Sequence, residues 1–129
     1  MIAENDGHPR ILIVDDDPDV RDGLSRALMV QGGFEVACAA DGFDAGFKFA
    51  RNRPHLVILD VVMKGMGGLD ICGRIRKLMR SDQVKIIVLT GFASDSTAAS
   101  SLVLGADLVL SKPCDTQSLL LHIEDLLTD

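Results

Sequence analysis

Five polar residues that could do chemistry come directly after four short apolar stretches of this sequence. They are Asp15, Asp16, Asp60, Thr90 and Lys112. Three carboxylates held close together repel one another, and a hard divalent cation such as Mg²⁺ relieves that repulsion. A lysine ammonium and a threonine hydroxyl suit the oxygens of a phosphoryl group. If these side chains meet, the set predicts phosphoryl transfer with an aspartate nucleophile, for which Asp60 is the candidate.

Each of these residues also has an ordinary structural explanation. Asp15 and Asp16 could cap a helix, and Thr90 could simply end a strand. Asp60 could merely begin the next loop. Lys112-Pro113 could form a turn with a solvated lysine, and its peptide bond is a candidate for the cis form. One shared site nevertheless explains the positions of all five residues together, whereas the ordinary explanations must each hold separately.

The elements that must position these residues alternate strictly between strands and helices. Short runs rich in Val, Ile and Leu indicate buried strands of a parallel sheet, at residues 10–14, 34–39, 55–59, 84–89 and 107–110. Helical patterns follow them, over residues 18–31, 43–52, 69–80, 95–104 and 115–127. This alternation predicts an α/β fold in three layers, a doubly wound (βα)5 unit with helices on both faces of a parallel sheet. Since parallel strands end at one edge, the five polar residues should converge there.

Apolar spacing and capping residues predict how the helices begin, end and face the core. Asp17-Pro18 indicates the start of the first helix and Gly32-Gly33 its end. In the second helix Ala45 and Phe49 should face inward, whereas the spacing does not place Phe43 and Phe47. The third helix should bury one stripe and expose a basic face. The stripe consists of Ile71, Ile75, Leu78 and Met79, and the opposite face of Arg74, Arg76, Lys77 and Arg80.

Composition and charge limit the class of protein. The chain has 129 residues, 47% hydrophobic and 25% charged, which is typical of one soluble globular domain. We expect a flexible polar lead over residues 1–9 and one domain over 10–129. The net charge of −6 argues against direct binding of nucleic acid, and no apolar run is long enough for a membrane span. Three widely spaced cysteines suggest neither zinc nor disulfides, so we expect a cytoplasmic protein.

Four segments together resemble the receiver domain of two-component response regulators. They are the apolar runs that lead into Asp15-Asp16, Asp60 and Thr90-Gly91, and the tripeptide Ser111-Lys112-Pro113. The resemblance covers roughly residues 10–127, and the combination of motifs is specific. It implies a flavodoxin-like fold with the strand order 2-1-3-4-5. It also implies a signalling domain that catalyses only its own phosphorylation and dephosphorylation.

The resemblance implies a role for each site residue. Asp60 would accept a phosphoryl group from a sensor histidine kinase or a phosphotransfer protein. Mg²⁺ would bind to Asp16, to Asp60 and to the backbone carbonyl of Val62, with Asp15 acting mostly through water. The phosphoryl oxygens would be bound by Thr90 and Lys112. Phosphorylation would then change the surface of the fourth helix, fifth strand and fifth helix, and so the binding of an output partner or the formation of a phosphorylation-dependent dimer.

The sequence departs from the family pattern near these residues. Lys64 stands where receivers usually have a proline, and Gly67-Gly68 where Asp-Gly is common. Val109 replaces a residue that is commonly aromatic, and Cys114 one that is usually phenylalanine. None of these positions supplies a ligand. Val109 and Cys114, however, belong to the surface through which receivers usually signal.

Two further positions concern the lifetime of the phosphorylated state. In receivers, the side chains two residues beyond the phosphorylated aspartate and two beyond the threonine border the path of the hydrolytic water. Here they are Val62 and Phe92. Neither can orient a water molecule, so we expect a long-lived acyl phosphate. The alternative is that both side chains simply pack against neighbouring loops.

Three other functions fit the sequence less well. An enzyme of the haloacid-dehalogenase type needs a second aspartate two residues after its nucleophile, and that residue is Val62. A flavodoxin-like FMN module needs a phosphate-binding loop after the first strand, where Asp15-Asp16-Asp17 would repel an anion. A receiver-like docking module that is never phosphorylated would not need the complete set of acids, threonine and lysine.

Overall fold

The computed structural model describes residues 7–61, 68–79, 83–91, 100–102 and 104–128. Its elements in chain order are β1 (Arg10–Val14), α1 (Pro18–Gly32), β2 (Glu35–Ala39), α2 (Gly42–Asn52), β3 (Leu56–Leu59), α3 (Gly68–Leu78), β4 (Lys85–Thr90), β5 (Leu108–Ser111) and α5 (Thr116–Leu127). Residues 100–102 are also helical. The remainder of the helix predicted over 95–104 lies largely outside the described residues.

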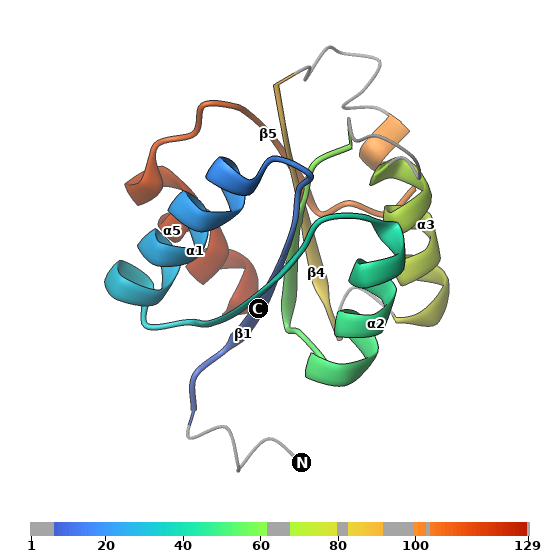
Figure 1. Cartoon of the computed structure of the whole chain (residues 1–129), viewed down its shortest axis with the longest axis horizontal. Helices are drawn as coiled ribbons and strands as arrows, with labels where there is room; N and C mark the ends of the chain where they lie inside the picture. Colours follow the sequence, from blue (N-terminus) through green and yellow to red (C-terminus); the bar gives the residue numbers. More distant parts are fainter. Residues whose placement is uncertain (1–6, 62–67, 80–82, 92–99, 103, 129) are drawn as a thin grey trace.

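The five strands form one parallel sheet in the order β2-β1-β3-β4-β5. In the ladder, Ile13 of β1 pairs with Ile58 of β3, which pairs with Ile87 of β4. Figure 1 shows α1 and α5 on one side of this sheet and α2 and α3 on the other. The predicted three-layer fold and its strand order are therefore confirmed.

Alternate strand residues divide the core into two halves, as the period of a strand requires. Leu12, Val57 and Ile86 pack toward Ala45 of α2 and Ile75 of α3. Their sequence neighbours pack toward α1 and α5, in a cluster that includes Ile11, Ile13, Ile58, Ile87, Leu28, Leu119 and Ile123. β1 and β3 are thus covered on both faces, which explains why their sequences are continuously apolar rather than alternating.

The predicted start and end of the first helix are confirmed. The Asp17 side chain accepts a hydrogen bond from the Asp19 amide at 2.9 Å, and Pro18 occupies the first helical position. Gly33 ends α1 with φ at 68°, a left-handed conformation that glycine adopts without steric cost. Among the described residues, no helix combines the length and apolar character that crossing a membrane requires.

The predicted faces of α3 need two corrections. Leu78, expected in the buried stripe, is 75% exposed. Arg76, expected on the solvated face, lies against the core edge and bonds to the Asp107 carboxylate at 2.8 Å. The reason is that α3 buries Ile71, Cys72 and Ile75 and thereby centres its inner face one position away from the predicted stripe.

The aromatic residues of α2 that the sequence did not place lie at the surface. Phe43 is 90% exposed and Phe47 is 57% exposed. Ala45 is buried and Phe49 is partly buried against the same core half, as predicted.

Candidate functional site

The backbone at the carboxyl ends of the strands is held by the sheet itself. The amide of Asp15 donates to the Ala39 carbonyl at 3.1 Å, and the amide of Asp60 donates to the Val14 carbonyl at 3.0 Å. At the other side of the sheet, the Lys112 amide donates to the Thr90 carbonyl at 2.9 Å. These bonds extend the ladder one residue past β1, β3 and β5, and they fix the backbone from which the side chains of Asp15, Asp60 and Lys112 project.

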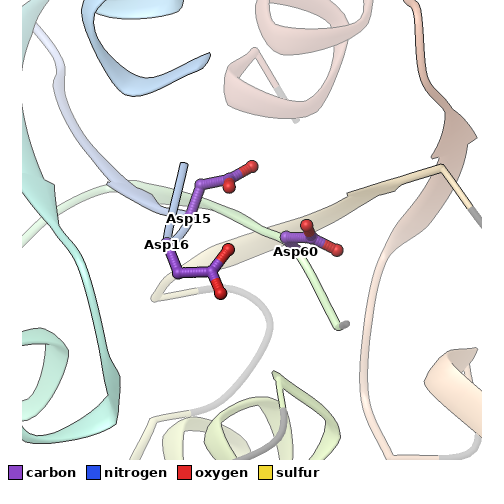
Figure 2. A group of neighbouring side chains, drawn as sticks. All are labelled: Asp15, Asp16 and Asp60. Atoms are coloured by element: carbon purple, nitrogen blue, oxygen red, sulfur yellow. The ribbon is translucent and has the colours of Figure 1, made fainter. Parts of the chain in front are cut away.

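Three carboxylates meet at this edge. One side-chain oxygen from each of Asp15, Asp16 and Asp60 lies within 4.8 Å of the others. Asp15 is 3% exposed and Asp60 is 7% exposed, while Asp16 is partly buried. Figure 2 shows Asp15 and Asp16 side by side at the end of β1, with their carboxylates directed toward the side on which Asp60 lies. An all-oxygen donor set of this kind suits a hard cation such as Mg²⁺.

The ammonium of Lys112 reaches two of these carboxylates. Its Nζ lies 2.7 Å from Oδ2 of Asp15 and 3.0 Å from Oδ2 of Asp60. Burial by itself would lower the pKa of Lys112, but the hydrogen bonds and negative charges of Asp15 and Asp60 outweigh it and raise that pKa. Lys112 is therefore a firmly charged cation that holds two strand ends together. The bond Lys112-Pro113 is cis, as the sequence suggested.

Asp15 has further partners on the first turn of α1. Its Oδ1 accepts a hydrogen bond from the Asp17 amide at 3.0 Å. Arg21 donates from Nη1 to the Asp15 backbone carbonyl at 2.7 Å. Sequence reasoning missed Arg21, although a basic residue on the first turn after three acids was a signal that could have pointed to it.

The remaining predicted residues divide into two groups. Thr90 ends β4 and is fully buried, and its register partner is Ser111, the residue before Lys112. Val62 and Phe92, with Lys64 and Gly67, lie outside the described residues. On the surface usually used for signalling, Val109 and Cys114 are both partly buried and pack on opposite halves of the core. The structure thus brings Asp15, Asp16, Asp60 and Lys112 into one cluster, with Thr90 adjoining Lys112 through the backbone.

Comparison with known proteins decides the family. The family model described as the response regulator receiver domain matches residues 11–124. The chain is a receiver domain of the two-component response regulators. This receiver domain is 42% identical over 118 residues to the response regulator MprA of Mycobacterium sp. strain KMS, and equally to that of Mycobacterium leprae. Those matches cover 92% of the chain but 50% of each relative, so the chain spans about half their length.

Solved structures agree with this assignment. A CheY-like receiver domain protein from Methanospirillum hungatei JF-1 superposes with a TM-score of 0.88 at 32% identity, covering 95% of both chains. The Vibrio cholerae chemotaxis protein CheY4 superposes with a TM-score of 0.86 at 30% identity, covering 94% of this receiver domain and all of that chain. Membership of this family favours a phosphoacceptor domain over a dehalogenase-type enzyme, an FMN module or a docking module that is never phosphorylated.

Proposed function

We propose that Asp60 is the phosphoacceptor of this receiver domain. A carboxylate oxygen of Asp60 attacks the phosphorus of a phosphohistidine on a sensor kinase or phosphotransfer protein. The new P–O bond forms as the P–N bond breaks, and the imidazole leaves with the electron pair. The observation that carries the proposal is the contact of Lys112 Nζ with Asp60 inside the acidic cluster, at 3.0 Å. A cation in that position can neutralise charge on the transferred group.

Asp60 is preferred over Asp15 because of its position at the end of the central strand. Both carboxylate oxygens of Asp15 already accept bonds, Oδ1 from the Asp17 amide and Oδ2 from Lys112. Asp15 therefore supports the site. Asp60 follows the central strand β3, between β1, which leads into Asp15 and Asp16, and β4, which ends at Thr90.

Receiver domains generally bind Mg²⁺, and the acidic cluster supplies the oxygen ligands that this ion prefers. We assign the ion to Asp16, Asp60 and the backbone carbonyl of Val62, with Asp15 acting through water. When bound, the ion neutralises negative charge on the phosphoryl oxygens. Thr90 and Lys112 bind those oxygens as hydroxyl and ammonium donors. The backbone bond between these two residues then lets one phosphoryl group act on β4 and β5 together.

The domain that carries this chemistry corresponds to residues 10–129 in our proposal, preceded by a short lead over residues 1–9. Its phosphorylated state is expected to be long-lived, because Val62 and Phe92 offer no side chain that could activate water. The output is a change in binding to another protein or to a second copy. The domain acts in the cytoplasm, where reduced thiols persist.

The test is phosphorylation by a small donor. The chain is incubated with Mg²⁺ and acetyl phosphate, and its intact mass is measured. Wild type should gain about 80 Da, the mass of one HPO₃ group. Asp60→Asn should gain nothing, while the matched control Asp70→Asn, at an exposed position on α3, should gain the same mass as wild type. A full adduct on Asp60→Asn would contradict the proposal.

A further inference from the structure

A concave apolar groove lies between α2 and α3, on the side of the sheet away from α1 and α5. Figure 1 shows these two helices side by side. The groove encloses about 610 Å³. Its lining includes the buried side chains of Ala45, Ile71 and Ile75 and the partly buried Phe49. This volume is large enough to take several apolar side chains from another molecule.

Large apolar side chains are exposed on the two helices that form the groove. Phe43 and Phe47 lie one turn apart on α2 and are 90% and 57% exposed, and Leu78 lines the groove from α3 and is 75% exposed. On the α2 surface Phe43 neighbours the lining residue Gly46, three positions on. Single exposed apolar residues are ordinary, but three of this size on the two helices that form one groove indicate an interaction surface.

The charges around the groove are basic, although the chain is acidic. Among the residues that line it, the charged ones are Arg74 and Lys77. The guanidinium of Arg51 lies over the Phe47 ring, 5.9 Å from its centroid. The acidic residues of α2 and α3 do not line the groove. Asp44 pairs with Lys48 at 3.3 Å, and Asp70 is not among the lining residues. A chain of net charge −6 thus presents two cations, Arg74 and Lys77, in the lining of an apolar groove.

We propose that the groove between α2 and α3 docks an acidic amphipathic helix of a partner protein. Such a helix would place apolar side chains at positions i, i+4 and i+7 in the groove and its carboxylates toward Arg74 and Lys77. The cations that line the groove, rather than the net charge of the chain, favour an acidic partner. A bilayer fits less well than a helix, because a flat surface does not fill a groove, and a second copy of this chain is the other alternative that the test distinguishes. The proposal goes beyond phosphorylation and does not depend on it.

The test uses two synthetic helical peptides with the same apolar stripe. One carries glutamates on its flanks and the other carries lysines at the same positions. Binding to the full chain is followed by fluorescence anisotropy, and the site is located by amide shifts in two-dimensional NMR. The glutamate peptide should bind and shift Gly46, Ala50 and Arg74, and the lysine peptide should bind about tenfold more weakly at low salt.

Two glycines provide a matched pair of variants. A Cβ at Gly46 would meet no atom within 4 Å, and the same holds for Gly23 on α1, so both positions can accept a side chain without disturbing the fold. Gly46→Gln places a polar side chain in the groove and should abolish binding of the glutamate peptide. Gly23→Gln should bind it like wild type. The double change Arg74→Glu and Lys77→Glu should reverse the preference between the peptides.

Other outcomes would overturn the proposal. They are the absence of binding by the glutamate peptide, equal binding of both peptides, or shifts confined to α1 and α5. Retained binding by Gly46→Gln would place the peptide elsewhere. Concentration-dependent dimerisation that Gly46→Gln removes would identify a second copy as the occupant, and co-sedimentation with anionic vesicles that Gly46→Gln removes would identify a membrane.

Discussion

The charged side chains at the two edges of the sheet are arranged differently. At the carboxyl edge, the described part of the chain gathers three carboxylates and the single ammonium of Lys112, which bonds to two of them. At the amino edge, Arg76 meets one carboxylate, that of Asp107, at 2.8 Å. The same guanidinium donates to the carbonyls of Gly105 at 3.0 Å and Val84 at 2.8 Å. The cluster at the carboxyl edge has more carboxylates than ammonium groups, whereas the pair at the amino edge matches one carboxylate with one guanidinium.

The difference separates a structural ion pair from a functional one. Asp107 also accepts the Ile86 amide at 2.7 Å, so the Arg76–Asp107 pair joins the end of α3, the start of β4 and the turn before β5. The turn before β5 needs glycine at position 105 to make room for Arg76. A Cβ on Gly105 would lie 2.6 Å from the Arg76 side chain, and the Gly105 φ of 114° is unsuitable for other residues. The carboxyl edge instead leaves negative charge for a cation to neutralise.

The largest effect on stability should come from the amino edge. Arg76→Met leaves the Asp107 carboxylate, only 17% exposed, without its cation. We expect the free energy of unfolding to fall by about 3 kcal/mol, as for a largely buried pair that loses one partner. Urea unfolding measures this, with Asp44→Asn in the more exposed Asp44–Lys48 pair, whose side chains are 35% and 34% exposed, as a control that should cost about 0.5 kcal/mol. Equal costs for the two variants would show that burial does not separate these pairs.

Lys112→Met should also destabilise, and here Mg²⁺ should compensate. The change leaves Asp15 and Asp60 close together without their shared cation, at a cost of about 2 kcal/mol in the absence of Mg²⁺. Adding Mg²⁺ should recover much of this loss, since the ion takes over the role of the ammonium. Thermal unfolding with and without Mg²⁺ tests the difference. Recovery of Arg76→Met by Mg²⁺ to the same degree would remove the distinction between the two edges.

Removing a negative charge from the acidic cluster should raise the free energy of unfolding, whereas removing Lys112 lowers it. Asp16→Asn relieves repulsion from its two neighbours and should stabilise the Mg²⁺-free protein by about 1 kcal/mol. It should also abolish the increase in Tm that Mg²⁺ produces in wild type. If Asp16→Asn destabilised the protein, or if its Tm still rose with Mg²⁺ as in wild type, the cation site would lie elsewhere.

The smallest effect is a pH dependence at the amino edge. Burial, with a smaller contribution from the positive charge of Arg10, lowers the pKa of His55 below 6.5, and its Nδ1 accepts the Arg10 amide at 2.9 Å. Below about pH 6.5, His55 therefore binds a proton in the unfolded chain but not in the folded chain. The free energy of unfolding declines as the pH falls toward the pKa of His55 in the folded state. His55→Asn keeps an acceptor and should remove this part of the decline, as urea unfolding at a series of pH values would show. Phosphorylation should not respond to this change.

The sequence predicted the carboxyl edge better than the amino edge for a physical reason. Strand ends in a parallel sheet share an edge, so Asp15, Asp60 and Lys112 could be brought together from strand positions alone. The Arg76–Asp107 pair depends on the rotation of α3 about its axis. The predicted apolar stripe was wrong by one position, so the prediction placed Arg76 on the outer face and Leu78 on the inner face. Which residues lie at the border of a buried helix face depends on the packing of small core residues such as Cys72, and the periodicity of the sequence does not contain that information.

The central claim is that the transferred phosphoryl group is carried by Asp60. The most direct test is to phosphorylate the chain with acetyl phosphate and Mg²⁺, reduce it with borohydride, which converts an aspartyl phosphate to homoserine, and map the product by peptide mass spectrometry. We predict homoserine at position 60, and none at positions 15 or 16. Homoserine at Asp15 or Asp16, or the absence of homoserine from a chain that has gained a phosphoryl group, would contradict the account.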